Sequence, residues 1–212
     1  DELVEVLKHL RETLKTLERV TSYARSKTLA QRKLEDLKAI REAGLDRLHV
    51  GLESGNDEVL AAIRKGVTSA ELIDGGQKAM AAGFQLSEYW MPGLAGMELW
   101  RRHAEDTARV LTAINPHYIR SRPFVPSSRT PIYEELAQGR LKVSSRHERL
   151  EELRVTIEGL EVTSRVCFDH MMNSWRNRYG GLLFHQDYEG YKFPEEKQHV
   201  LDLIQEGLAV GE

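Results

Sequence analysis

The chain has 212 residues, of which 41% are hydrophobic and 30% are charged, and its formal net charge at pH 7 is −3. Because the two signs nearly cancel, the composition argues against a basic nucleic-acid-binding stripe and a polybasic membrane-binding face. The single cysteine, Cys167, excludes an internal disulfide and a cluster held by three thiolates of this chain. With no apolar run of 18 residues and no signal-like N-terminus, we expect a soluble, cytoplasmic protein without membrane contact.

The first part of the chain alternates helix and strand signals. Apolar residues at helical spacing predict an amphipathic helix over residues 1–17, and a short β-prone stretch follows at 18–23. A second helix over 33–44 ends at a glycine, and the apolar run 47–52 predicts a buried strand. A short helix over 56–64 comes next.

The same alternation continues through the middle of the chain. Thr68 and Glu71 form a capping-box pattern that opens a helix. Residues 84–91 predict a third strand, which a glycine-rich turn joins to a helix over 99–114, and residues 117–122 predict a fourth strand. Because the connections are too long for hairpins, the four strands should be parallel.

These strands begin near residues 18, 47, 84 and 117, which is the spacing of βα units in a barrel or a wound sheet. The first strand has no earlier partner in this chain, and four strands of a barrel would leave open edges. We therefore expect further strands upstream of residue 1, and an open edge through which the chain could self-associate. The alternative is a complete small α/β domain that begins with a helix.

The alternation stops after the fourth strand. We expect residues 1–140 to hold the βα units and residues 141–212 to form a helical C-terminal extension. In that extension, a serine-capped helix runs to about residue 161, and Pro194 opens a last helix. We interpret the aromatic segment between these helices as a strap packed over the core.

Candidate functional residues lie where strands end, because barrels and wound sheets carry their working groups there. Those positions hold Tyr23, Arg25, Glu53, Ser54, Gly55, Tyr89, Met91, the loop Pro92–Glu98, Arg120 and Arg122. Glu53 is the most informative, because a carboxylate at a strand end beside glycines can accept both hydroxyls of a ribose. The alternative is an ion pair of Glu53 with Arg25 or Lys27.

Other groups show weaker patterns. Arg120 and Arg122 alternate and so point to one face of their strand, where an arginine needs a carboxylate or phosphate partner. That partner is the carboxylate of a bound amino acid or, alternatively, Glu53 or Glu88. The cysteine and a nearby histidine have a ligand-like spacing, but no second cysteine pair completes a zinc site.

Several ordered motifs resemble those of radical S-adenosylmethionine (SAM) enzymes. LHVGLESGNDEVLAAIRKGVT, at residues 48–68, is similar to the family's GLESGSDEVLKxMxKGxT stretch, and PGLAGME stands in place of its GLPGE sequence. INPHYIRSRPFVPSSRTPIYEEL, at 114–136, resembles the family's INPDYI…PxxGTPLYEE segment. The resemblance covers about residues 1–160 and is strongest over 47–136.

The resemblance implies a partial parallel (β/α)6 TIM-like barrel, in which the four strands would be the third to the sixth. In the family, a Cys-x-x-x-Cys-x-x-Cys loop holds a 4Fe–4S cluster, SAM binds its fourth iron, and reductive cleavage yields a 5′-deoxyadenosyl radical. The implied parent is a radical SAM enzyme, an oxidoreductase with an electron donor and a substrate that the sequence does not identify. The cysteine loop and the first two strands are absent here, so we expect this chain to need the missing N-terminal part and to be inactive alone.

Carried over position by position, the resemblance places SAM against the strand ends. The cofactor-binding residues that it implies are Tyr23, Arg25, Glu53, Ser54, Met91, Gly93, Gly96, Arg120, Phe124 and Val125. Glu53 would lie near the ribose, the stretch 91–96 and Phe124 near the adenine, and Arg120 near the carboxylate. The resemblance assigns no catalytic residue and no metal ligand to this chain.

Two other functions stay open from the sequence. A non-radical barrel hydrolase could use Glu53 and Glu88 as acid and base if both carboxyls lay at one mouth of the sheet. A non-catalytic chain of this fold could serve as a scaffold or a partner-binding domain.

Overall fold

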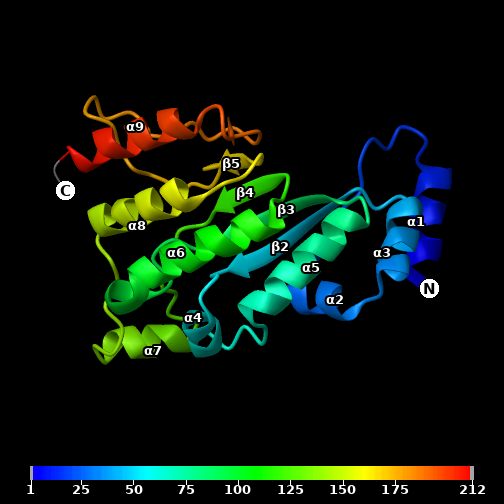
Figure 1. Cartoon of the computed structure of the whole chain (residues 1–212), viewed down its shortest axis with the longest axis horizontal. Helices are drawn as coiled ribbons and strands as arrows, with labels where there is room; N and C mark the ends of the chain where they lie inside the picture. Colours follow the sequence, from blue (N-terminus) through cyan, green and yellow to red (C-terminus); the bar gives the residue numbers. More distant parts are fainter. Residues whose placement is uncertain (1, 211–212) are drawn as a thin grey trace.

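The computed structural model describes residues 2–210, and the strands in that range form one sheet (Figure 1). They lie across the sheet in chain order as β1 Thr21–Ala24, β2 Arg47–Glu53, β3 Gln85–Trp90, β4 Tyr118–Ser121, β5 Arg165–Cys167 and β6 Tyr191–Lys192. Neighbouring strands from β1 to β5 are parallel, and β6 is antiparallel to β5. The parallel α/β arrangement that the sequence predicts is confirmed.

Helices connect the strands and cover one face of the sheet (Figure 1). They are α1 Glu2–Thr13, α2 Ser26–Gln31, α3 Leu34–Glu42, α4 Asp57–Ala62, α5 Ser69–Ala81, α6 Gly96–Ile114, α7 Pro131–Ala137, α8 Arg146–Gly159 and α9 Lys197–Leu208. Helix α6 packs between α5 and α8, whereas α1 and α9 lie toward opposite ends of the long axis. In the part of the chain that the structure describes, no helix is long and apolar enough to cross a membrane.

The C-terminal segment differs from its prediction in one respect. Residues 141–212 hold the two predicted helices, α8 and α9, but they also supply β5 and β6, which extend the sheet beyond the four predicted strands. The expected helical extension is therefore an incomplete description. Because β5 has three residues and β6 has two, neither is long enough to show an alternating pattern. The division of the chain at residue 140 stays a prediction.

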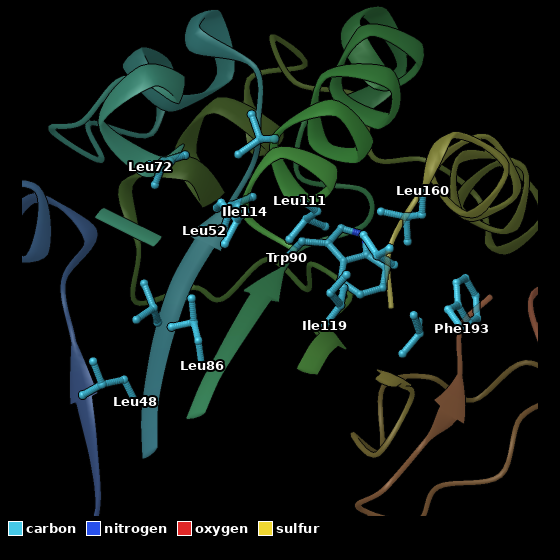
Figure 2. Close-up of a cluster of buried hydrophobic side chains, with 14 of the residues drawn as sticks. Leu48, Leu52, Leu72, Leu86, Trp90, Leu111, Ile114, Ile119, Leu160 and Phe193 are labelled. Atoms are coloured by element: carbon cyan, nitrogen blue, oxygen red, sulfur yellow. The ribbon is translucent and has the colours of Figure 1, made fainter. Parts of the chain in front are cut away.

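Alternation along the strands separates their side chains onto two faces. On the face under the helices, Leu52, Leu86 and Trp90 form the main apolar core with Leu111 and Ile114 of α6 (Figure 2). The opposite face, called the polar face below, carries Arg47, His49, Gly51, Gln85, Ser87, Tyr89, Tyr118 and Arg120. One face of the sheet is thus apolar and covered by helices, and the other face carries a row of mostly polar side chains.

Residues 168–190, called the strap below, connect β5 to β6 and fold back onto the sheet. Trp175 and Phe184 are buried in the main core with ring centroids 6.0 Å apart. Asp169 and Tyr188 reach the polar face, where both contact Arg120. The predicted strap is present, and it also contributes polar groups to the sheet.

Candidate functional site

Glu53 ends β2 at the edge of the sheet where the parallel strands have their carboxyl ends. Its backbone has a φ of 65°, which is uncommon for a residue other than glycine. A Cβ added at Gly51 would lie 2.1 Å from Glu53 Oε1, so the carboxylate occupies the space that a side chain at Gly51 would need. A side chain at Gly51 would therefore displace this carboxylate from its present position.

The Glu53 carboxylate lines a pocket of about 560 Å³. The other lining residues are Ala24, Arg25, Ser26, Lys27, Gly51, Ile63, Arg64, Lys65, Gly66 and Val67. Lys65 is the ion-pair partner of Glu53, with Nζ 2.9 Å from Oε1, and the two side chains are 26% and 23% exposed. Neither Arg25 nor Lys27, the partners considered from the sequence, forms this pair, and the carboxylate stays accessible from the pocket.

The two candidates from the end of β1 lie beside this pocket but in different settings. Arg25 lines the pocket together with Glu53. Tyr23 is 78% exposed and lies on the polar face, with its ring centroid 5.4 Å from that of His49.

The candidates expected near an adenine ring form a separate group. Met91 and Phe124 belong to a second, smaller apolar cluster around Leu94. Phe124 is buried, whereas Val125 is 48% exposed. A pocket of about 310 Å³ lies at this cluster between α4, the turn after β3 and α7, and Ile63 lines both this pocket and the one at Glu53. The polar and the apolar pockets are therefore neighbours.

Gly93 and Gly96 shape the turn after β3. Both have positive φ angles, 85° and 63°, which glycine adopts without steric cost. The Gly93 N–H donates to both carboxyl oxygens of Glu152 in α8, at 2.9 and 3.0 Å. A Cβ at Gly96 would lie 2.7 Å from Leu141 Cδ1. The turn itself and its packing explain these two glycines.

Ser54 is buried in an internal chain of polar contacts rather than facing the pocket. Its Oγ lies 2.7 Å from His103 Nδ1 and accepts from the Asn56 N–H at 3.0 Å. His103 Nε2 lies 3.3 Å from Glu152 Oε1, and Glu152 in turn holds Gly93. These contacts tie the loop after β2 to the turn after β3.

Burial makes His103 and Glu152, the two ionisable groups in this series of polar contacts, neutral near pH 7. It lowers the pKa of His103 to about 4 and raises the pKa of Glu152 to about 8, although the Gly93 N–H acts on Glu152 in the opposite direction. A serine, histidine and glutamate in this order resemble a nucleophilic triad, but such a serine must reach its substrate. Since Ser54 is 0% exposed, these polar contacts have a structural role.

Arg120 is buried, and its guanidinium is held by three partners. Nη1 lies 2.8 Å from Asp169 Oδ2, Nε donates to Ser87 Oγ at 3.0 Å, and Nη2 donates to the Tyr188 carbonyl at 3.1 Å. Arg122 pairs with the same Asp169 at 2.9 Å. The partner of both arginines is thus an aspartate of the strap, not either of the glutamates considered from the sequence.

Glu88 lies on the face of β3 that packs under the helices, because it alternates with Ser87 and Tyr89 of the polar face. It is 2% exposed, and its Oε2 has no hydrogen-bond partner among the described residues. Burial raises the pKa of Glu88 well above its usual value, and the nearby Glu53 raises it further. Glu88 is therefore buried, whereas Glu53 lines an open pocket that Glu88 does not line, so the two carboxyls do not share one opening.

Cys167 is a buried thiol in β5. Burial raises its pKa to about 12, so the thiolate that metals bind is disfavoured. Within residues 2–210, no group of three or more histidine, cysteine, aspartate or glutamate side chains could hold a metal ion.

Sequence reasoning missed the groups that arrive from distant loops. Lys65 reaches Glu53 from the segment after α4, and Asp169 and Tyr188 reach the polar face from the strap. His49 is hydrogen bonded to the Tyr89 hydroxyl at 2.8 Å; its position in β2, alternating with leucine and valine, was the available signal for a polar face. No comparable signal marks the residues of the strap.

Residues 1–105 match the model of the Radical SAM superfamily. The heme chaperone HemW of Bacillus subtilis (strain 168) is 23% identical to this chain over 128 residues, which are 60% of this chain and 33% of that protein. This chain thus spans about a third of the length of this curated relative.

Solved structures share the fold at low sequence identity. The archaeal Elp3 of Methanocaldococcus infernus matches with a TM-score of 0.59 at 16% identity, over 88% of this chain and 41% of that one. Coproporphyrinogen III oxidase (HemN) of Escherichia coli, a radical SAM enzyme, matches with a TM-score of 0.55 at 19% identity, over 73% and 35% of the two chains. Methylornithine synthase (PylB) matches with a TM-score of 0.54 at 17% identity, over 78% and 44%.

Proposed function

We propose that this chain, whose residues 1–105 carry a Radical SAM superfamily domain, supplies part of the SAM site of an enzyme that cleaves SAM reductively. The observation that carries the proposal is the accessible Glu53 carboxylate, which the side-chain-free Gly51 accommodates at the carboxyl edge of a parallel sheet. Ligands of open α/β sheets bind outside this edge.

The residues around the pocket fit the parts of SAM. Glu53 would accept hydrogen bonds from the ribose hydroxyls, while Arg25 and Lys65 offer cations to the carboxylate of the methionyl group. The neighbouring pocket beside Leu94 and Ile63 offers an apolar surface to the adenine. When bound and reduced, SAM supplies a 5′-deoxyadenosyl radical that abstracts hydrogen from a substrate.

A 4Fe–4S cluster does not fit this chain. Such a cluster needs three thiolates, and the sequence contains only Cys167, whose thiol is buried in β5. We therefore assign no cluster-dependent step to these residues. In the proposal, the three cysteines, an electron donor and the substrate come from outside the 212 residues.

The test is a calorimetric titration of SAM into the wild-type chain and into Glu53→Gln. The amide keeps the shape of the side chain but removes its charge and one acceptor for the ribose. We expect the wild type to bind SAM and the variant to bind at least about tenfold more weakly, since hydrogen bonds to charged groups contribute about 1.5–3 kcal/mol.

Glu35→Gln is the matched control, because Glu35 is an exposed carboxylate of α3. Its affinity for SAM should equal that of the wild type. Equal affinities of all three proteins for SAM would contradict the proposal. Hydrolase activity of this chain in the absence of SAM would also contradict it. If the chain joined to a polypeptide carrying three cysteines, reconstituted with iron and sulfide and reduced, released no 5′-deoxyadenosine from SAM, a non-catalytic binding role would be favoured instead.

A further inference from the structure

Three rings on the polar face form a continuous aromatic surface. Tyr23 of β1 lies 5.4 Å from His49 of β2 and 6.4 Å from Tyr89 of β3, measured between ring centroids, and the planes of the two tyrosines differ by 20°. His49 and Tyr89 are 5.5 Å apart and hydrogen bonded. Tyr23 is 78% exposed, so one end of this surface is open to solvent and can stack against another ring.

Positive charge surrounds these rings. The Arg122 guanidinium lies 4.7 Å from the centre of the Tyr89 ring, and the buried Arg47 and Arg120 belong to the same face of the sheet. In the described part of the chain, Asp169 is the carboxylate that pairs with Arg120 and Arg122, and Arg47 has no ion-pair partner. This face is therefore cationic in a protein whose net charge is −3.

The lowered pKa of His49 reflects the same positive charge. Its pKa is lowered to about 4, first by burial and then by Arg120, Arg47, Arg122 and Arg19. The imidazole is consequently neutral near pH 7. The positive charge that attracts an anion to this face comes from the arginines around it.

Arg122 has donors to spare for such an anion. It is 24% exposed, and Nη1 donates to the Ser121 carbonyl and to Asp169, while Nη2 donates once to Asp169. A guanidinium has five N–H groups, so within residues 2–210 the Nε hydrogen and one Nη2 hydrogen are without a partner.

The aromatic surface adjoins the pocket at Glu53. Tyr89 is the register partner of Gly51, and Gly51 lines that pocket. A ligand that stacks on Tyr23 therefore lies next to the proposed position of SAM, at the place where a substrate of the proposed reaction would be needed.

We propose that Tyr23, Tyr89 and Arg122 form a binding site for a planar organic anion, with its ring stacked on Tyr23 and its carboxylate or phosphate at Arg122. The role of this ligand as substrate rests on the proposed function. Its binding does not, because no SAM is needed for the contacts that define the site.

The experiment measures binding of three probes to the wild-type chain by calorimetry: 2-naphthoate, 2-naphthyl phosphate and the neutral 2-naphthalenemethanol. The first two share the ring but differ in the anionic group, so their relative affinities distinguish a carboxylate site from a phosphate site. We expect at least one anion to bind about tenfold more tightly than the neutral probe and to weaken with added salt.

Tyr23→Ala and Arg122→Gln should each weaken the better anion at least about fivefold, with Tyr23→Phe retaining affinity because a phenyl ring still stacks. Tyr179 and Arg178 provide a matched control in the strap, since Tyr179 is 80% exposed and the Arg178 guanidinium lies 4.8 Å from its ring centre. Tyr179→Ala should leave the affinity unchanged.

Equal affinity for the anionic and neutral probes, or an equal loss in Tyr179→Ala and Tyr23→Ala, would overturn the site. A parallel titration with SAM separates the two proposals. Probe binding without SAM binding removes the proposed function and keeps this site, whereas SAM binding without probe binding does the reverse. Unchanged thermal unfolding of the variants shows that a loss of binding is not a loss of fold.

Discussion

At the scale of single residues, His103 and Glu152 form a buried contact whose two pKa values are both shifted. Both side chains are almost fully buried. Asp106 raises the pKa of His103 and Arg149 lowers that of Glu152, but burial dominates in each case. A neutral carboxyl held by the Gly93 N–H is therefore the state of the folded protein near pH 7.

We expect the free energy of unfolding to fall as pH rises from about 6.5 to 8, the range in which Glu152 titrates in the folded protein. Its folded pKa of about 8 lies above its ordinary value of 4.5, so the unfolded chain releases this proton first and stability falls as pH rises between those values. His103, lowered from 6.5 to about 4, has the opposite effect below pH 6.5. The two effects cancel there, and Glu152 acts alone from about pH 6.5 to 8.

Denaturant unfolding of the wild type and Glu152→Gln measures this effect. The difference in unfolding free energy between the two proteins should change by up to about 1.4 kcal/mol per pH unit between pH 6.5 and 8, in the direction that favours the variant at higher pH. A pH-independent difference would show that Glu152 does not titrate in this window.

At the scale of elements, the loop after β2 is fixed by its close approach to α6. The Gly55 N–H donates to Thr107 Oγ1 at 2.9 Å, and a Cβ at Gly55 would lie 2.3 Å from the Asp106 carbonyl oxygen. Because this obstacle is helix backbone, a side chain here forces the loop away from α6.

Gly55→Ala should therefore destabilise the protein by about 1–3 kcal/mol, the range expected when a well-packed contact is overfilled. Gly181→Ala is the comparison, because its added Cβ meets only the Asn177 side chain, at 3.2 Å. Thermal unfolding checks both, and equal melting temperatures for the two variants would show that the loop does not depend on this approach.

The predictability of the elements followed their length and pattern. Strands β2 and β3 were predicted to within one residue at every end, because they are the longest strands and each lies between clear helix signals. The first helix ends at Thr13 rather than at residue 17, and β1 starts at Thr21 rather than at residue 18. The two shortest strands, β5 and β6, were missed because their pairing depends on contacts distant in sequence.

At the scale of the whole molecule, the strap and the sheet are joined by buried charge. Asp169 is the link, because it pairs with Arg120, which is 0% exposed, and with Arg122. Burial alone would raise the pKa of Asp169, but these two arginines lower it below its usual value. The carboxylate is thus ionised, and its loss leaves a buried guanidinium without a counter-ion.

Asp169→Asn should cost about 3–5 kcal/mol of stability, as for other broken buried ion pairs. The accompanying signature is faster amide exchange in the strap than in β2, which keeps its own pairing. Asp74→Asn removes an exposed ion pair with Lys78 and should change stability by less than about 1 kcal/mol. Similar losses in the two variants would contradict the role given to Asp169.

The positions of some candidate residues could be predicted from the sequence, whereas the contacts that hold others could not. Glu53 and Arg25 follow apolar strands, so their place at one edge could be predicted from the parallel arrangement alone. The burial of Ser54 could not, because it depends on His103 and Glu152, which come from two later helices. Lys65 likewise reaches Glu53 through a turn whose direction no local pattern specifies.

The most direct measurement is a crystal structure of the chain with S-adenosylhomocysteine, which is stable and shares the ribose, adenine and amino acid groups of SAM. We expect ligand density over Gly51, with both ribose hydroxyls within hydrogen-bonding distance of the Glu53 carboxylate. Density at another surface, with Glu53 still paired only with Lys65 at saturating ligand, would contradict this expectation.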